Sequence, residues 1–157
     1  MKIQLKHLLE TFTGIKIFRN SLPRWVNLSK DIMRIHPYEI QEVWYIGAHK
    51  GETTLKFAGD YPTALIRSFE PVSENYYSLK NNCSCLKNQS PHNIVLGEEN
   101  KKTKTFLQDS SVIHSLRDDL NNPTAEDSKT EEVNQTTVVS LFNKFNCPNI
   151  DVLKNRY

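Results

Sequence analysis

The sequence predicts an α/β fold with a mostly parallel, Rossmann-like sheet, and three observations support this prediction. The stretch from Val43 to Thr54 reads as a short apolar strand, a turn with two glycines, and the start of a helix. A second apolar strand, residues 65–69, follows soon afterwards and ends in a carboxylate, Glu70. Strand and helix patterns then alternate as far as residue 97, an order typical of a parallel sheet with helices on its faces.

Size and composition are those of a single globular domain. The chain has 157 residues, 38% of them hydrophobic, and a net charge of +2, which does not indicate a nucleic-acid-binding protein. No apolar run approaches the roughly 18 residues of a membrane span, and the first residues lack the apolar block of a secretory signal. We therefore expect a cytoplasmic protein with no transmembrane segment and no nucleic-acid partner.

The cysteines and histidines do not show a recognisable metal-binding pattern. Cys83 and Cys85 are two residues apart on a predicted helix and so point in different directions, and Cys147 is distant in the sequence. The histidines do not occur in pairs with metal-ligand spacing. We predict free thiols and no metal.

Residues 1–38 are predicted to form a helical N-terminal extension, and residues 39–157 to form the α/β domain. Apolar residues at helical spacing occur on both sides of Gly14 and Pro23, and Pro37 ends the pattern. The charges of the extension are mixed, so we expect it to pack on the sheet edge or ligand cleft rather than on a membrane. Its apolar positions are Leu5, Leu8, Leu9, Phe12, Val26, Leu28, Ile32 and Met33.

The first half of the domain is predicted to supply two helices and a third strand. Residues 52–58 read as a short helix that Gly59 caps at its C-terminal end. A longer helix starts near Ser73, and after a loop at 88–91 residues 92–97 read as the third strand. The side chains expected to face the sheet are Leu55, Phe57 and Ala58 from the first helix and Tyr76, Leu79, Cys83 and Leu86 from the second.

The pattern changes after Gly97. Residues 103–107 alternate like a half-exposed strand and indicate an inserted antiparallel segment, and the polar residues 108–131 indicate a surface loop. A short strand at 133–137, a helix at 138–145 and a strand at 149–154 follow. The core side of that helix is expected to carry Val138, Leu141, Phe142 and Phe145.

The last predicted strand lies close to the end of the chain. A parallel strand inside a sheet normally pairs on both sides, so a strand in this position leaves an unpaired edge. We therefore expect a sheet that is incomplete at its C-terminus, with self-association possible through the edge at residues 150–154.

The candidate ligand site lies where the first two strands end. Gly47 and Gly51 let the backbone turn sharply and approach a ligand, and the amides of the next helix face the same space. Glu70 lies 19 residues after Gly51, close to the roughly 20-residue interval at which nucleotide-binding α/β units present an acid to a ribose. This arrangement favours an adenosine-containing cofactor.

An ordered set of motifs resembles the FkbM family of S-adenosylmethionine-dependent methyltransferases. The similarity runs from about Val43 to Lys154, which is most of the chain. The motifs are Tyr45-Ile46-Gly47-Ala48-His49-Lys50-Gly51, Ser68-Phe69-Glu70-Pro71-Val72-Ser73-Glu74-Asn75, Val95-Leu96-Gly97-Glu98-Glu99-Asn100, Ser110-Ser111-Val112, Thr136-Thr137-Val138 and Ile150-Asp151-Val152-Leu153-Lys154.

The resemblance implies a class I methyltransferase sheet with S-adenosyl-L-methionine as its cofactor. Gly47 and Gly51, with Ala48 between them, would surround the methionine part, Glu70 would bind the ribose hydroxyls, and Asn75 would help in that pocket. The implied reaction is methyl transfer to a hydroxyl of a sugar or natural product. In such a reaction the protein aligns the acceptor oxygen with the methyl group and removes its proton. The resemblance does not identify a catalytic residue.

Two features differ from the family pattern. Tyr45 stands where the family usually has an acidic residue, and a neutral phenol does not replace a carboxylate beside a cationic sulfonium and ammonium. The family also continues after its fourth strand with an acidic, glycine-containing motif, whereas this sequence ends at Asn155-Arg156-Tyr157. A second hypothesis is therefore a truncated, catalytically inactive methyltransferase-fold remnant that acts as a binding or interaction module.

A nicotinamide-dependent Rossmann enzyme is a weaker, third hypothesis. Its fingerprint has three glycines as G-x-G-x-x-G, and only Gly47 and Gly51 occur here. The remaining polar candidates have simpler interpretations. His49 and His114 are interpreted as exposed residues rather than catalytic bases. Asp109, Asp118 and Asp119 are interpreted as solvated loop charges.

Overall fold

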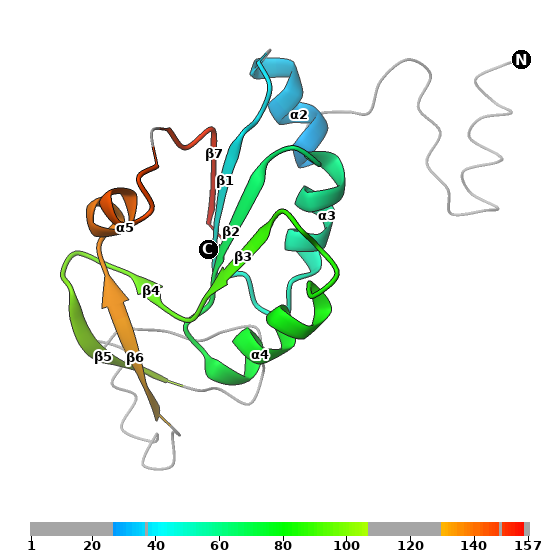
Figure 1. Ribbon diagram of the computed structural model, residues 1–157. Helices are drawn as coiled ribbons and strands as arrows, with labels where there is room; N and C mark the ends of the chain where they lie inside the picture. Colours follow the sequence, from blue (N-terminus) through cyan, green and yellow to red (C-terminus); the bar gives the residue numbers. More distant parts are fainter. Residues whose placement is uncertain (1–26, 37, 107–129, 148, 156–157) are drawn as a thin grey trace, which may run out of the picture. The chain divides into compact units, whose positions relative to one another are not determined.

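Figure 1 shows the computed structural model of the chain, which describes residues 27–36, 38–106, 130–147 and 149–155. The chain divides into two compact units, residues 1–39 and 40–157. Among the described residues, no helix is both long enough and apolar enough to cross a membrane.

The described helix of the first unit is α2, Leu28–Ile35. The side chain of Asn27 caps its start, because Oδ1 accepts a hydrogen bond from the amide of Lys30 at 3.1 Å. The prediction of a helix in this region is therefore confirmed for these eight residues. Residues 1–26, the rest of the predicted helical extension, lie outside the described part of the chain.

The second unit contains a four-stranded sheet with the strand order β3-β2-β1-β7. All three pairings within it are parallel, so the predicted α/β fold with a mostly parallel sheet is confirmed, and the arrangement fits a Rossmann-like fold. The chain runs from the first strand to one side and later returns to the other, so the strand order reverses beside β1. The strands are β1, Glu42–Ile46, β2, Leu65–Phe69, β3, Gln89–His92, and β7, Val152–Asn155.

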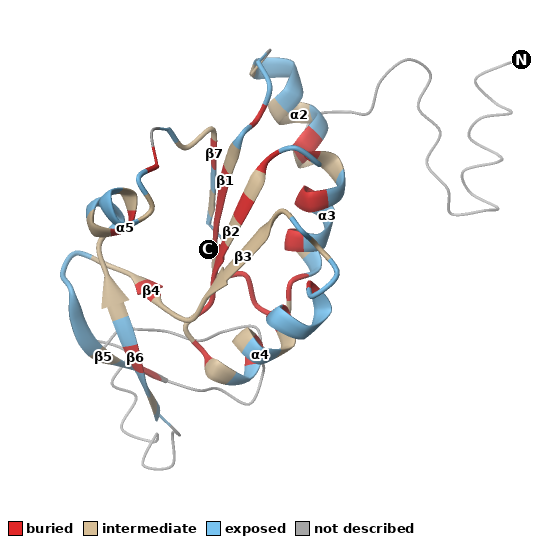
Figure 2. Cartoon of the chain, viewed as in Figure 1, coloured by how far each residue is buried: buried red, intermediate tan, exposed pale blue. Residues whose placement is uncertain are grey.

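Three helices of the second unit accompany the sheet. They are α3, Glu52–Asp60, α4, Ser73–Asn82, and α5, Val138–Lys144. On the α3 side, the ring of Phe57 contacts that of Tyr45 edge to face, and the hydroxyls of Thr54 and Ser68 share a hydrogen bond of 2.9 Å. The opposite side of β1 carries Trp44, which belongs to a core cluster with Leu141 of α5. Figure 2 shows the resulting run of buried residues along β1 and β2.

A second, three-stranded sheet has the order β4-β6-β5. Its strands are β4, Val95–Leu96, β5, Lys101–Phe106, and β6, Thr130–Thr136. The pairing of β5 with β6 is antiparallel, as predicted for the inserted segment, whereas β4 pairs with β6 in parallel. Residues 108–129 of the predicted surface loop lie outside the described residues, whereas residues 130 and 131, which were also expected in the loop, belong to β6.

The third strand of the parallel sheet was predicted too late in the sequence. It comprises Gln89–His92, of which residues 89–91 were expected to be a loop, and Val95–Leu96 belongs to the second sheet instead. The strand contains Pro91 and, within the described ranges, pairs with β2 alone. Proline has no amide to donate to a second neighbour, so it is tolerated in a strand at the edge of a sheet.

The helices also differ from expectation in detail. Helix α3 continues through Gly59 to Asp60, so Gly59 is not its C-terminal cap. Leu55 and Val138 are exposed, whereas both were expected to face the core. Of the face predicted for the next helix, Leu79 and Cys83 are buried, Tyr76 is half-buried, and Leu86 is half-buried and lies beyond the end of α4.

Candidate functional site

The loop that joins β1 to α3, residues 47–51, has an unusual backbone. Gly47, His49 and Gly51 all have positive φ angles, of 72°, 52° and 95°. Such angles are easily adopted by glycine and rarely by other residues. A Cβ atom on Gly51 would also lie 2.9 Å from Sγ of Cys83 and 2.9 Å from Cδ1 of Leu79. Gly51 is therefore required both by its backbone angle and by its close packing against α4.

The carboxylate of Glu70 holds this loop in place. Glu70 follows β2, and only 4% of its surface is exposed. Its Oε2 accepts a hydrogen bond from the amide of His49 at 2.8 Å, and its Oε1 accepts one from the amide of Val72 at 3.1 Å. Hydrogen bonds of this kind compensate the cost of burying a carboxylate. The predicted acid therefore contacts the predicted glycine turn directly.

Backbone and side-chain contacts join the same loop to the neighbouring strand ends. The carbonyl oxygen of Phe69 accepts hydrogen bonds from the amides of Gly47 at 2.9 Å and Ala48 at 3.0 Å. Next to it, Nδ2 of Asn93 donates to the carbonyl oxygens of Glu70 at 3.0 Å and Pro71 at 2.8 Å. These bonds fix where β2 ends relative to β1.

A residue of the second sheet caps the helix that follows Glu70. The N-cap residue of α4, Val72, has no side chain that can accept a hydrogen bond. Instead, the amide of Ser73 donates to both carboxylate oxygens of Glu131, at 3.1 and 3.2 Å. Sequence reasoning missed Asn93 and Glu131, because each acts on a residue at least 20 positions away.

The predicted site residues fall into two groups in the structure. Gly47, Ala48 and Gly51 lie in one loop, and Glu70 binds that loop through the amide of His49. Asn75 is buried in α4, and among the described residues no hydrogen bond joins it to the loop or to Glu70.

Two other residues near the loop were interpreted from the sequence, and both are buried. Tyr45 packs edge to face on Phe57, so its ring belongs to the core between β1 and α3. His49 was expected to be exposed, but only 9% of its surface is accessible. Its Nε2 has no hydrogen-bond partner among the described residues. The error arises because Glu70 draws the backbone of His49 toward β2. His114, Asp109, Asp118 and Asp119 lie outside the described residues.

Several features of the loop suit the binding of a nucleotide cofactor. Because Gly51 is the N-cap of α3, the helix begins without a side-chain cap. Amides in an uncapped first turn are available to a negatively charged group. Tyr45, which stands where the resemblance to the FkbM family implies an acidic residue, is buried in the core. The glycine turn and the acid after β2 therefore suit such a cofactor, whereas Tyr45 does not supply the expected carboxylate.

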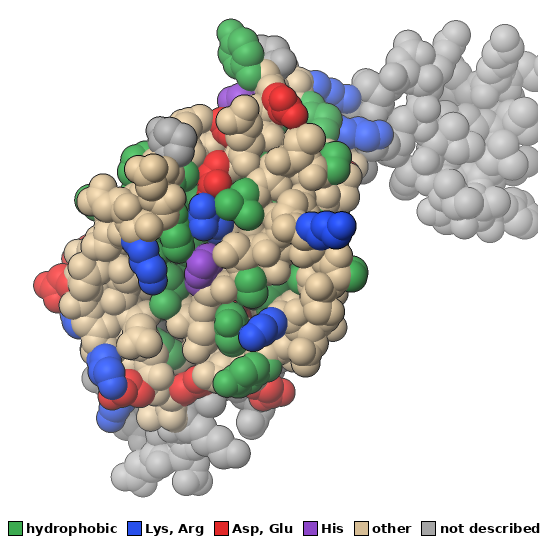
Figure 3. Space-filling model, in the orientation of Figure 1, with side chains coloured by type: hydrophobic (Ala, Val, Ile, Leu, Met, Phe, Trp, Pro, Cys, Tyr) green, Lys and Arg blue, Asp and Glu red, His purple; other side chains and the backbone are tan. Residues whose placement is uncertain are grey.

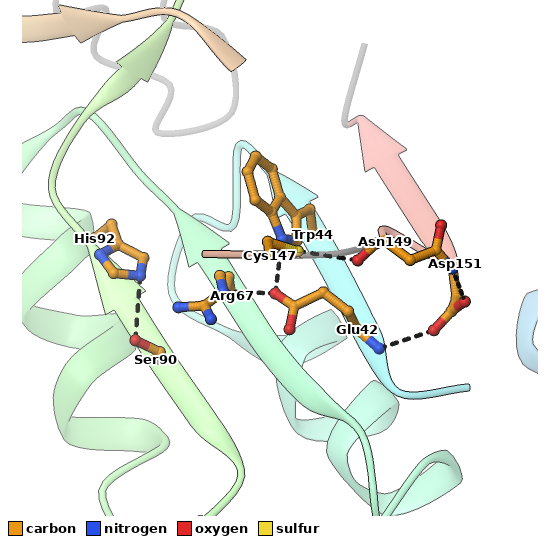
Figure 4. Close-up of polar contacts among 8 residues, drawn as sticks. All are labelled: Glu42, Trp44, Arg67, Ser90, His92, Cys147, Asn149 and Asp151. Carbon is orange, nitrogen blue, oxygen red and sulfur yellow. Dashed lines mark hydrogen bonds and ion pairs between the residues drawn. The ribbon is translucent and has the colours of Figure 1, made fainter. Parts of the chain in front are cut away.

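A second polar cluster occupies the α5 side of the sheet (Figure 4). Oε1 of Glu42 accepts hydrogen bonds from Nε of Arg67 at 2.5 Å and from Nε1 of Trp44 at 2.7 Å. The guanidinium carbon of Arg67 lies 4.1 Å from the centre of the Phe145 ring. A charged residue in the middle of the mostly apolar strand β2 is the sequence signal that would have identified Arg67.

His92 lies in the same cluster and has a strongly lowered pKa. Burial is the largest cause, followed by the positive charges of Arg67 and Lys144, and together they lower the pKa from 6.5 to about 4. The ring stacks on Phe69, and Nε2 and the hydroxyl of Ser90 are hydrogen-bonded at 3.1 Å. His92 is therefore neutral at pH 7.

The described part of the chain contains no group of three or more histidine, cysteine or acidic residues that could hold a metal. Cys83, Cys85 and Cys147 are free thiols, as predicted. Burial raises the pKa of Cys83, assisted by Cys85 and Glu52, and burial is also the main cause of the raised pKa of Cys147. These two thiols are therefore protonated at neutral pH.

Comparison with models of known protein families finds no match, and comparison with curated proteins finds no significant match. The function therefore has to be argued from the geometry of the chain itself.

Substitution of Gly51 is expected to destabilise the protein. Gly51→Ala should lower the free energy of unfolding by about 2–4 kcal/mol, because it combines backbone strain with overpacking against Leu79 and Cys83. Urea denaturation would measure the change. Gly59→Ala is the matched control, since Gly59 lies in α3 and a Cβ there meets open space. The control should be neutral or stabilising by up to about 1 kcal/mol. Equal effects of the two substitutions would contradict the role of Gly51.

The low pKa of His92 is expected to make stability pH-dependent. Between about pH 4 and 6.5 the unfolded chain binds a proton at His92 that the folded chain does not. The contribution of His92 to stability should therefore be complete above pH 6.5 and fall as the pH is lowered toward 4. NMR titration of the His92 ring would give its pKa, and urea denaturation at several pH values would give the stability.

Lys144→Ala should raise the pKa of His92, because it removes one of the positive charges that lower it. Lys80→Ala, at the end of α4, is the matched control and should leave the pKa of His92 unchanged. Titration of His92 near its ordinary value of 6.5 in the folded protein would show that the ring is not buried as described.

Proposed function

We propose that residues 40–155 bind S-adenosyl-L-methionine at the glycine loop and that the protein is an FkbM-like methyltransferase. The proposed reaction is O-methylation of a sugar or natural-product hydroxyl. The observation that carries the proposal is the position of the loop: it follows β1 beside the point where the strand order reverses, with Glu70 against it. Ligands of open α/β sheets bind at this point, outside the carboxyl ends of the strands.

The shape of the loop also supports this proposal. Positive φ angles at Gly47 and Gly51 turn the chain away from the strand within five residues, and as glycines these positions carry no Cβ atom. The uncapped start of α3 provides backbone donors for the carboxylate of the methionine part. Glu70, at the end of β2, has the placement and chemistry expected for an acid that binds ribose hydroxyls.

Under this proposal Glu70 has two roles. Each carboxylate oxygen already accepts one backbone amide, from His49 or Val72. A carboxylate has about four acceptor positions, so capacity for the hydroxyls of a ribose is left. Because Glu70 is 4% exposed, binding of the ribose would be coupled to the conformation of the loop that covers it.

The residues of this chain would orient the cofactor and the acceptor. S-adenosylmethionine supplies an activated methyl group, so alignment of the acceptor oxygen accounts for most of the catalysis. Gly47, Ala48 and Gly51 would surround the methionine part, and buried Asn75 would support the pocket from α4. The base that removes the acceptor proton is not identified among these residues.

A second candidate function is a catalytically inactive module that associates through a sheet edge. Strand β7 pairs with β1 alone in the described part of the chain, and Leu153 is 57% exposed. An unpaired strand edge with an exposed apolar side chain is a template for pairing with another strand. The absence of a carboxylate at Tyr45 also favours this alternative.

The first proposal predicts saturable binding of S-adenosylmethionine or its demethylated product in isothermal titration calorimetry. Glu70→Gln should weaken it roughly tenfold to a hundredfold, because hydrogen bonds to a charged group contribute about 1.5–3 kcal/mol. Glutamine keeps one acceptor oxygen for the loop. Glu74→Gln, at an exposed position in the first turn of α4, is the matched control and should bind normally.

Circular dichroism and thermal denaturation should show that both variants are folded. The proposal fails if the folded wild-type protein binds neither compound, or if the two substitutions weaken binding equally.

The alternative predicts concentration-dependent self-association in sedimentation velocity experiments. Leu153→Glu should shift the protein toward the monomer by about tenfold in dissociation constant, because it places a charge on the edge strand. Leu55→Glu, at an exposed position on α3, introduces the same charge away from the edge and should have no effect. A wild-type protein that is monomeric at every concentration would exclude association through β7.

A further inference from the structure

The guanidinium of Arg67 is held in one orientation on the α5 side of the sheet. Its Nε donates to Oε1 of Glu42 at 2.5 Å, and its guanidinium carbon lies 4.1 Å from the centre of the Phe145 ring. The side chains of Arg67 and Glu42 are each 13% exposed. Because Glu42 is in turn bound by Nε1 of Trp44, the arginine is supported by a rigid core residue.

In the described part of the chain, only one edge of this guanidinium is hydrogen-bonded. Among the described residues, the hydrogen bond from Arg67 is made by Nε. Figure 4 shows the two outer nitrogens on the side away from Glu42, toward β3. Two parallel N–H groups match the two oxygens of a carboxylate or phosphate.

Further donors surround the free edge. Ser90 and His92 come from β3, at the positions that pair with Arg67 and Phe69 of β2. Lys144 of α5 is close enough to His92 to lower its pKa, and Lys144 itself is exposed. Figure 3 shows basic, acidic and histidine side chains meeting among apolar ones at the centre of this face.

We propose that Arg67, together with Ser90 and Lys144, forms a binding site for the oxyanion of a small ligand, either a carboxylate or a phosphate monoester. Arg67 binds the oxyanion through its two outer nitrogens, Ser90 donates its hydroxyl, and Lys144 contributes a second positive charge from α5. This site is distinct from the glycine loop. It does not rest on the proposed methyltransferase function.

The geometry of the Glu42 contact favours a ligand over a purely internal ion pair. Among the described residues, Glu42 contacts Arg67 at Nε alone, and the second carboxylate of the cluster, Asp151, binds the backbone amides of Gln41 and Glu42 instead. An arginine–carboxylate pair that served stability alone would be stronger with a bidentate contact, in which two N–H groups of the arginine bind the two carboxylate oxygens. Here the contact with Glu42 orients the guanidinium and leaves its outer nitrogens available.

The test uses inorganic phosphate and acetate as probes, each added at constant ionic strength with chloride as the balancing ion. Two-dimensional NMR would follow the amide signals of β2 and β3 and the Nε signal of Arg67. We expect saturable shifts in these signals with at least one probe. Binding of phosphate alone identifies the ligand as a phosphate monoester, and binding of acetate with equal or greater affinity identifies it as a carboxylate.

Three variants assign the binding to the proposed residues. Arg67→Lys keeps the positive charge but removes the two parallel N–H groups of the guanidinium, and it should weaken binding by about fivefold or more. Lys144→Ala and Ser90→Ala should each weaken it by about twofold to threefold. Lys80→Ala removes an equal charge from α4 and should have no effect.

The proposal is overturned if neither probe gives saturable shifts, or if Lys80→Ala weakens binding as much as Lys144→Ala. If Arg67→Lys fails to fold, Lys144→Ala and Ser90→Ala decide the question. Unchanged binding in both of them overturns the proposal, and weaker binding in both supports it.

Discussion

The buried carboxylate of Glu70 is the interaction on which the candidate site depends. It accepts one amide from the loop after β1, that of His49, and one from the segment before α4, that of Val72. Without it, two amides at a buried position would lose their partners, at a cost of about 1–3 kcal/mol for each group. The positive φ angle of His49 is maintained by the same contact. The shape of the loop and the position of the acid are therefore a single structural feature.

The α/β fold could be predicted from the sequence because its evidence is local. Apolar strands, glycine turns and helical periodicity each appear within about ten residues. The third strand was misplaced because Gln89–His92 is polar and contains Pro91, so it lacks the apolar pattern on which strand prediction depends. It forms because β2 offers an unsatisfied edge, and pairing with β2 is a tertiary effect.

The candidate site was predictable only as far as strand ends determine it. Gly47, Gly51 and Glu70 were identified because parallel strands bring their carboxyl ends to one edge. The hydrogen bonds of Glu70, the capping of α4 by Glu131 and the pairing of Glu42 with Arg67 join residues that are distant in the sequence or on different elements. Local patterns do not specify such contacts, and for this reason the burial of His49 was also missed.

Strand β2 contributes to both proposed sites because successive side chains of a strand point to opposite faces. Ser68 contacts Thr54 on the α3 side, whereas Arg67 and Phe69 face α5. Glu70 follows at the carboxyl end, three residues beyond Arg67, which corresponds to roughly 10 Å along the strand. Under the proposed methyltransferase function, an acceptor bound through an oxyanion at Arg67 would need only the length of a small molecule to reach the sheet edge where the glycine loop lies. Each proposed site is nevertheless supported by its own contacts.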